Sequence, residues 1–300
     1  MKLQLNWSYR SQLFTILNET FFYNLKSYSQ TQAFFWIVVL SLAGALNIFN
    51  TGCDNTTPDS ISPMILTVGK GSGLNGDGSG PPPVELNTTD NFTLLAQSAI
   101  STERPSEIEG NVGLYSAKSN FMTGFFLSPP LDTFSTSQQI SGRFYAFDYS
   151  SPTPALLSAA AEDMKIASRD AASREPDHVD ISGGLLEDLS LPPATYYWSS
   201  NVVVNSNLNL LGGPHDVWIF QISGNLMLNS KTRVLLSDGI QSGNIYWQIT
   251  GHTVLEENTH FEGVLLADKS INLKSQASVK GLLFSGTSII LDRNKIIKPN

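Results

Sequence analysis

A short pattern of alternating apolar and polar positions recurs along the C-terminal part of the chain. Each copy begins with Asn, Ser or Thr and continues with apolar side chains at alternate positions, which is typical of short β-strands. The five copies, whose starts lie 18, 28, 17 and 18 residues apart, are Asn207–Leu210, Asn225–Leu228, Thr253–Glu256, Ser270–Leu273 and Ser288–Leu291. A period near 18 residues is too short for a propeller blade and fits a solenoid coil of three short strands and three corners.

Longer apolar segments follow the same period. Val217–Ile222 parallels Asn244–Ile249, and Gly263–Ala267 parallels Gly281–Ser285 at a spacing of 18 residues. The glycine that opens each of the last two segments suits a tight corner, where the backbone φ angle is positive. The pattern therefore predicts a mainly β fold, a right-handed β-solenoid with triangular coils of about 18 residues.

The alternation also predicts which side chains face the core, because successive residues of a strand point to opposite sides. The predicted inward residues are Leu208, Leu226, Val254, Ile271, Ile289, Leu210, Leu228, Leu273 and Leu291. The predicted outward columns, with rungs about 4.8 Å apart, are Asn207, Asn225, Thr253, Ser270, Ser288 and Asn209, Met227, Leu255, Asn272, Ile290. The 28-residue step predicts an extra loop or irregular coil, where a slip of one residue would exchange inside and outside.

One segment has a helical pattern. The apolar residues that recur at helical spacing between residues 152 and 174 are Leu157, Ala160, Ala161, Met164 and Ala171. We expect Thr153 to cap this helix, with Pro154 at its first position. A helix of this size is roughly 30 Å long, similar to a stack of six coils about 4.8 Å apart. We therefore expect one long α-helix packed along the solenoid axis.

The N-terminal region has the pattern of an export signal. An uncharged apolar run, Phe34–Phe49, follows three basic residues, and it is closer in length to a signal-peptide core than to a membrane span. The single cysteine, Cys53, comes directly afterwards. This order resembles a bacterial lipoprotein signal, which implies lipidation of Cys53; an uncleaved anchor helix and cleavage at another site remain open.

The same region sets the expected domain boundaries. We expect residues 1–53 to be a signal or anchor segment and 54–83, rich in Asn, Ser, Gly and Pro, to be a flexible tether. The solenoid then occupies residues 84–300. Under each of the three explanations of the N-terminus, the solenoid is exported. We therefore expect the protein to be membrane-anchored at the cell surface or in the periplasm, or secreted.

Charge and composition exclude several classes of function. Residues 1–53 carry a net charge of +2, so the total of −8 leaves −10 for the rest, which repels the phosphates of nucleic acids. A single cysteine leaves no disulfide within the chain and no cysteine zinc site. The four histidines lack ligands at metal-binding spacing, and no serine lies in a Gly-x-Ser-x-Gly motif. We therefore expect no enzymatic activity, no cofactor and no metal site.

Several longer motifs follow one another in order between Val84 and Ile297. They are the opening segment Val84–Ile100, the glycine turn Glu109–Gly113, the turn Leu189–Tyr197 with Ala194 in place of glycine, and the strands Asp216–Ile222, Asn244–Ile249 and Phe261–Ala267. Together they resemble the ice-binding (antifreeze) proteins that combine a discontinuous β-solenoid with a flanking helix. The resemblance covers roughly 210 residues and implies this fold and binding to ice.

The resemblance also implies where ice would be contacted. The family's motif Thr-(Ala/Gly)-x-(Thr/Asn) corresponds here to His252–Leu255, Lys269–Asn272 and Thr287–Ile290, in which only Asn272 and Thr287 match. The candidate ice-contact residues, from the outward columns and this motif, are Asn207, Asn209, Asn225, Met227, Thr253, Leu255, Ser270, Asn272, Thr287, Ser288 and Ile290.

Two classes of function therefore remain. In the first, an exported protein adsorbs to the surface of an ice crystal through a flat solenoid face and inhibits ice growth or recrystallisation. In the second, a membrane-anchored solenoid is an adhesion or structural module that binds a cell-surface glycan. Small polar residues on the exposed strands fit both, because Ser, Thr and Asn suit the strands and turns of any solenoid.

Overall fold

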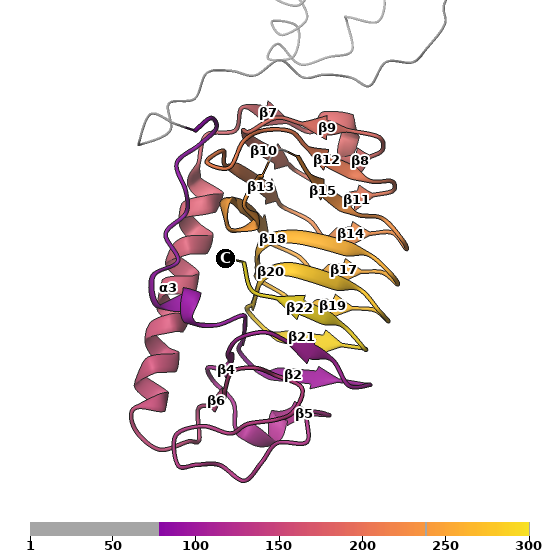
Figure 1. Cartoon of the computed structure of the whole chain (residues 1–300). Helices are drawn as coiled ribbons and strands as arrows, with labels where there is room; N and C mark the ends of the chain where they lie inside the picture. Colours follow the sequence, from indigo (N-terminus) through magenta and orange to yellow (C-terminus); the bar gives the residue numbers. More distant parts are fainter. Residues whose placement is uncertain (1–77, 238, 300) are drawn as a thin grey trace, which may run out of the picture. The chain divides into compact units, whose positions relative to one another are not determined.

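The structure, a computed structural model, describes residues 78–299 except residue 238. The expected signal segment, the lipidation of Cys53 and most of the expected tether lie outside this range. Within it, parallel strands stack into coils and a single long α-helix lies along one side of the stack (Figure 1). The predicted β-solenoid with a flanking helix is confirmed.

Two large sheets form two sides of each coil. The strands of the helix-covered sheet, in spatial order, are β6 (Phe144–Ala146), β4 (Val112–Leu114), β1 (Leu94–Ala96), β20 (Ser278–Ser285), β18 (His260–Ala267), β16 (Ile245–Ile249), β13 (Trp218–Ile222), β10 (Thr195–Trp198) and β7 (His178–Val179). The strands of the open sheet are β5 (Met122–Thr123), β2 (Ala99–Thr102), β21 (Ser288–Leu291), β19 (Ile271–Leu273), β17 (Thr253–Leu255), β14 (Leu226–Leu228), β11 (Val202–Val204) and β8 (Leu185–Leu186).

The third side of the coils is built from shorter pieces. Its strands are β9 (Ser190–Leu191), β12 (Leu208–Leu210) and β15 (Val234–Leu236), followed by the first halves of β18 and β20 and then by β22 (Lys295–Ile297) and β3 (Glu107–Ile108). Short 3-10 helices at Asn87–Asn91, Ser119–Phe121, Ile181–Gly184 and Ser242–Asn244 lie in the connections. All pairings between these named strands are parallel, as a solenoid requires.

The order of the coils in space differs from their order in the chain. The N-terminal coils stack on the C-terminal ones, because β1 pairs with β20 and β2 pairs with β21. Leu94 lies opposite Leu283, and Ser101 lies opposite Ile290. Between them the chain passes through the helix to the far end of the stack and returns coil by coil (Figure 1). The solenoid is therefore discontinuous, and it contains a seam between distant parts of the sequence, nearer the end of the stack that holds β5 and β6.

The interior of the coils is filled by aliphatic and aromatic columns. Tyr196, Phe220 and Trp247 stack in successive coils, and the ring centroids of the last two are 4.0 Å apart. The helix-covered sheet is buried on both sides, since the outward side chains of its central strands pack under the helix. This explains why its strands are continuous apolar runs in the sequence.

The flanking helix, α3 (Thr153–Ser173), has nearly the predicted bounds. Its buried residues include the whole predicted stripe, Leu157, Ala160, Ala161, Met164 and Ala171. They pack on the outward residues of the helix-covered sheet, among them Ile219 and Val264. The predicted cap is wrong: the helix begins at Thr153, whose hydroxyl donates to the carbonyl of Thr133 at 2.6 Å and so ties the helix to the preceding loop.

The coil that contains β15 and β16 is irregular, as the 28-residue step predicted. Leu226 of β14 pairs with Thr253 of β17, whereas the next coils keep a regular register from Thr253 to Ile271 and from Ile271 to Ile289. The extra residues lie around the short helix Ser242–Asn244. This register makes the predicted orientation of one strand wrong: Thr253 and Leu255 are buried, and Val254 faces outward.

The glycine corners and the start of the solenoid are also visible. Gly263 has the predicted positive φ, 122°, whereas Gly281 is required for space, because an added Cβ would lie 1.9 Å from the Gly263 carbonyl oxygen. The last residues of the expected tether belong to the fold. The backbone N–H of Ser79 donates to the Asp216 carboxylate at 2.6 Å, and its carbonyl accepts a hydrogen bond from Val217. Residues before 84 therefore contact the solenoid.

Candidate functional site

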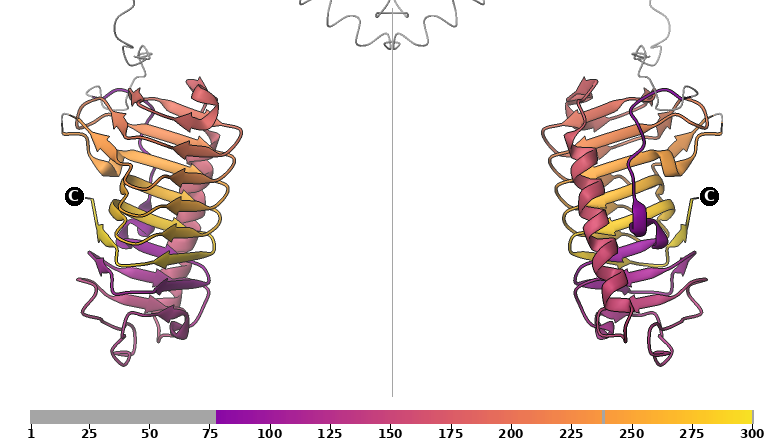
Figure 2. Two further views of the ribbon diagram at one scale, coloured as in Figure 1. Left: turned by 90° about the vertical axis from the view of Figure 1, so that its right-hand side faces the viewer. Right: turned by 90° about the vertical axis from the view of Figure 1, so that its left-hand side faces the viewer.

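Among the residues that the structure describes, one of the three sides is both regular and uncovered. Helix α3 and the segment before β1 cover the first sheet, and the third side is interrupted and charged. The outward side of the open sheet faces away from the helix and presents strands stacked in regular succession (Figure 2). We call this side the open face. Its eight rungs, at about 4.8 Å each, extend about 34 Å along the solenoid axis.

A single column of side chains runs along the middle of the open face, with one residue from each coil. Most of these residues are partly exposed, because they are the outward members of strands whose neighbours are buried. In spatial order the column is Leu185, Val203, Met227, Val254, Asn272, Ile290, Ser101 and Thr123. The column is mainly aliphatic in the coils of β8 to β17 and carries short polar groups toward the coils of β2 and β5.

One edge of the open face is a ladder of polar side chains that hold one coil to the next. The Asn201 side-chain oxygen accepts a hydrogen bond from the Asn225 backbone at 2.8 Å, and Asn225 in turn accepts one from His252 at 2.7 Å. The His252 ring contacts the Ser270 hydroxyl at 2.8 Å. These amides fix the spacing and direction of the coils, so this edge of the face is rigid.

The opposite edge carries charged residues. In the C-terminal coils it includes Lys274 and Asp292, and Asp292 forms a two-pronged ion pair with Arg104, with Arg104 Nε 2.6 Å from one carboxylate oxygen. The hydrogen bond from this guanidinium holds the pKa of Asp292 below its usual range. Because Arg104 follows β2 and Asp292 follows β21, the ion pair bridges the seam of the solenoid.

The structure sorts the predicted site residues into four groups. Asn225, Met227, Ser270, Asn272, Ser288 and Ile290 all lie on the open face. Thr253 and Leu255 are buried, so they are removed from the candidate set. Thr287 is partly exposed at the corner where the chain enters β21, and its carbonyl accepts a hydrogen bond from Ser98 at 2.8 Å.

Asn207 and Asn209 lie on the third side of the solenoid and do not share a surface with the other candidates. They belong to β12 and its approach, and Asn209 pairs with Leu235. The Asn207 side chain accepts a hydrogen bond from the Arg233 backbone at 3.0 Å, a coil-to-coil contact like those at the edge of the open face. The neighbouring outward residues on this side include Arg233, His260 and Glu262.

Sequence reasoning missed part of the open face. Val203 was not predicted, although Asn201–Val204 has the same pattern, an Asn followed by apolar residues at alternate positions. Val254 was assigned to the core by the register slip. Ser101 and Thr123 come from the N-terminal coils, whose pairing with β21 no local pattern reveals. Val203 has the local signal of an outward residue, because it lies between two buried aliphatic residues, Val202 and Val204.

Two other kinds of site, a metal site and a membrane-spanning helix, were sought among the described residues. Within residues 78–299, no group of three His, Cys, Asp or Glu side chains is arranged to hold a metal ion. Over the same residues, no helix combines the length and the apolar character of a membrane-spanning segment. The open face is therefore the principal candidate surface among the described residues.

The fold and this face define a class, the parallel β-solenoids with a helix along one side and a regular uncovered face on another. The ice-binding-like family matches residues 94–297, and the chain belongs to this family. An ice-binding protein of Leucosporidium sp. (strain AY30) is 36% identical over 239 residues, covering 78% of this chain and 91% of that protein. One of Colwellia sp. is 36% identical over 228 residues, covering 74% and 86%.

Solved structures show the same architecture. A glycosylated ice-binding protein from an Arctic yeast aligns with a TM-score of 0.72 at 36% identity, covering 73% of this chain and 95% of that one. A domain of Shewanella frigidimarina ice-binding protein 1 aligns with a TM-score of 0.69 at 29% identity, covering 74% and 99%. The matched region, which corresponds to the solenoid, is nearly the whole of each of these solved chains.

Proposed function

We propose that this protein binds ice through the open face and inhibits the growth or recrystallisation of ice. The observation that carries the proposal is the register of the face: eight parallel strands present one partly exposed residue per coil without cover from any other described element. Membership of the ice-binding-like family and the printed names of its relatives support the same function.

The mechanism follows from rigidity and from the mixture of side chains. The hydrogen-bonded edges hold the coils at a fixed spacing, so little conformational entropy is lost when the face meets a solid surface. Aliphatic groups such as Val254 and Ile290 constrain the water beside them, and neighbouring Asn272 and Ser101 anchor that water by hydrogen bonds. Adsorbed molecules then stop the ice front between them, without a chemical reaction.

A bulky substitution in the central column tests this proposal. In residues 54–300, Ile290→Tyr projects a ring from the middle of the open face, and Leu235→Tyr makes a matched change at an exposed position on the third side. We expect Ile290→Tyr to raise the concentration needed to inhibit ice recrystallisation about tenfold, which corresponds to ~1.4 kcal/mol. Leu235→Tyr should leave it unchanged. Equal activity of both variants, or no inhibition by the parent protein, contradicts the proposal.

We further propose that the protein is exported and held at a membrane through Cys53. The support is in the sequence: an uncharged apolar run precedes a lone cysteine, and a polar stretch follows it. The test is fractionation of bacterial cells that express the full chain, with metabolic labelling by a fatty-acid analogue. Label and membrane association that disappear in Cys53→Ala support lipidation. Membrane association without label favours the uncleaved anchor helix, and release of the protein favours cleavage elsewhere.

The alternative function, a surface adhesion module, requires a binding site other than an ice face. A groove beside helix α3 offers such a site.

A further inference from the structure

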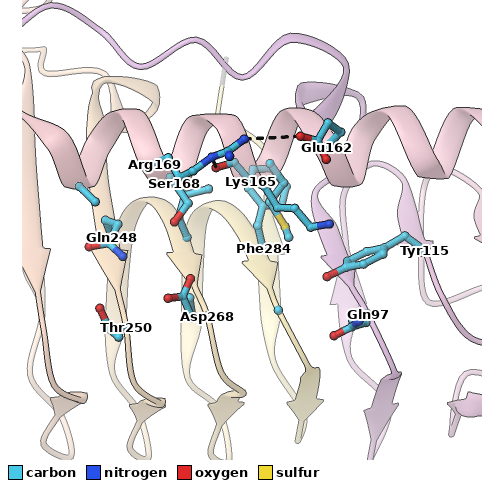
Figure 3. Close-up of a pocket in the computed structure, with 15 residues that line it drawn as sticks. Gln97, Tyr115, Glu162, Lys165, Ser168, Arg169, Gln248, Thr250, Asp268 and Phe284 are labelled. Carbon is cyan, nitrogen blue, oxygen red and sulfur yellow. Dashed lines mark hydrogen bonds and ion pairs between the residues drawn. The ribbon is translucent and has the colours of Figure 1, made fainter.

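A groove of about 670 Å³ runs between helix α3 and the ends of the strands that the helix covers (Figure 3). It lies on a different side of the solenoid from the open face. Its floor is formed by outward residues of the helix-covered sheet, including Gln248, Leu266 and Phe284. One wall is the exposed flank of α3 with Lys165, Ser168 and Arg169, and the other wall is a column of residues just after the strands.

That column extends across five consecutive coils. Each residue directly follows a strand whose register with its neighbours is fixed, and the order is Thr250, Asp268, Gly286, Gln97 and Tyr115. Four steps of about 4.8 Å give the groove a length of about 19 Å. In the middle of the column only glycine fits, because a Cβ on Gly286 would lie 2.4 Å from the Asp268 carbonyl oxygen. The groove is thus long and narrow, a shape that suits an elongated ligand.

The floor contains a polar side chain, Gln248, that is largely buried beside the groove. Gln248 is only 6% exposed, lines the groove, and makes no side-chain hydrogen bond to another described residue. Gln221 occupies the same column one coil away, and its amide nitrogen donates to the carbonyls of Ala171 and Arg174 at 2.8 Å each. The Gln248 amide makes no such contact with the helix, so it is available to exchange hydrogen bonds with a ligand in the groove.

The walls offer further hydrogen-bonding groups. The Asp268 carboxyl has no hydrogen-bond partner among the described residues, and partial burial raises its pKa. Across the groove, Arg169 contacts Glu162 at 3.4 Å, an exposed ion pair (Figure 3). Burial also raises the pKa of Tyr115, to about 12, so its hydroxyl is neutral and able to donate. Leu266 and Phe284 add an apolar strip to this polar surface.

This combination of groups selects one chemical class. Amide, carboxyl and hydroxyl groups beside an apolar strip match a sugar, which has hydroxyl groups at its rim and C–H groups on its faces. A lipid would leave the polar walls unpaired. A polyanion is disfavoured, because Glu162 and Asp268 balance Lys165 and Arg169 and the exported part carries a charge of −10. We propose that the groove binds a neutral oligosaccharide lying parallel to α3.

The proposal is tested by calorimetric titration of residues 54–300 with defined hexasaccharides. The neutral probes are cellohexaose, maltohexaose and chitohexaose, and the acidic probe is a hexamer of galacturonic acid. We expect saturable binding of at least one neutral probe, weakened at least tenfold by Gln248→Leu and by Asp268→Ala. Gln97→Ala, at an exposed side chain on the same wall, should weaken it as well and does not depend on the packing of the floor.

Ile290→Tyr is the matched control, since it alters the open face and leaves the groove intact. It should reduce ice activity and retain sugar binding. Gln248→Leu should reduce sugar binding and retain ice activity, so the two proposals are tested independently. Three results overturn the proposal: no saturable binding of any neutral probe at millimolar concentration, binding unchanged in all three groove variants, or tighter binding of the acidic probe than of every neutral one.

Discussion

The environment of Thr253 does not match the chemistry of its side chain. Its side chain lies in the core between Leu226 and Ile271 of the adjoining coils, it is fully buried, and its hydroxyl has no hydrogen-bond partner in the described structure. A buried hydroxyl without a partner loses its hydrogen bond to water and gains nothing in return. Its presence among aliphatic neighbours is therefore unfavourable for stability, and the fold tolerates it.

We expect Thr253→Val to stabilise the protein by about 1 kcal/mol, because valine has the same shape and no hydroxyl to desolvate. The measurement is chemical denaturation of residues 54–300. Thr259→Val is the control: Thr259 is equally buried, but its hydroxyl donates to the Glu256 carbonyl at 2.9 Å, so its loss should destabilise by a similar amount. Destabilisation by Thr253→Val would show that the hydroxyl has a partner after all.

The same residue shows how far a periodic pattern predicts orientation. Where coils keep a regular length, from Thr253 to Ile271 and Ile289, alternation alone places Ser270, Asn272 and Ile290 correctly. Before Thr253 the coil contains an extra loop, and the pattern then permits two registers one residue apart. A threonine that opens a strand looked like a surface residue, and only the backbone pairing with Leu226 determines that it is not.

At the scale of elements, helix α3 is held to the sheet at its C-terminal end by one side chain. Gln221, on β13, donates both amide hydrogens to carbonyls of the last turn, those of Ala171 and Arg174. Carbonyls at a helix C-terminus have no partner within the helix, so such a contact replaces the water they would otherwise bind. The helical stripe of alanines was predictable from spacing, whereas this contact depends on where β13 lies in the stack.

We expect Gln221→Leu to lower the free energy of unfolding by about 2 kcal/mol, since it leaves two carbonyls unpaired, at least one of them buried. Gln248→Leu, in the same column one coil away, removes an amide that pairs with no described residue, and should change stability little. Thermal unfolding followed by circular dichroism compares the two variants. Equal effects would mean that helix capping by Gln221 contributes nothing beyond the bulk of the side chain.

At the scale of the whole molecule, the decisive feature is the seam between the N-terminal and C-terminal coils. No repeat in the sequence indicates that β1 and β2 stack on β20 and β21, because the segments lie almost 190 residues apart and each resembles an ordinary coil strand. The discontinuous order of the coils was predicted only from the resemblance to the ice-binding proteins. The contacts at the seam are specific: Asn294 is buried, accepts from the Asp292 backbone at 2.7 Å, and its own backbone N–H donates to the Ser106 hydroxyl at 3.0 Å.

The Arg104–Asp292 ion pair makes the stability of this seam dependent on pH. Because the hydrogen bond from Arg104 lowers the pKa of Asp292 in the folded protein, the pair contributes stability above the pKa of an unfolded aspartate, about 4. That contribution is lost as the pH falls through the lower, folded value. We therefore expect Arg104→Gln to lower the Tm at neutral pH, and the difference from the parent protein to shrink below about pH 4.

Arg169→Gln provides the comparison for this prediction, since it breaks an ion pair whose two side chains are largely exposed and should leave the Tm unchanged at every pH. A Tm difference for Arg104→Gln that is independent of pH would assign its effect to packing. If the difference instead follows the titration of Asp292, one ion pair between residues 188 positions apart in the chain couples the two halves of the solenoid. Opening of the seam would then divide the open face where Ile290 and Ser101 adjoin, so acid should weaken ice activity before the protein unfolds globally.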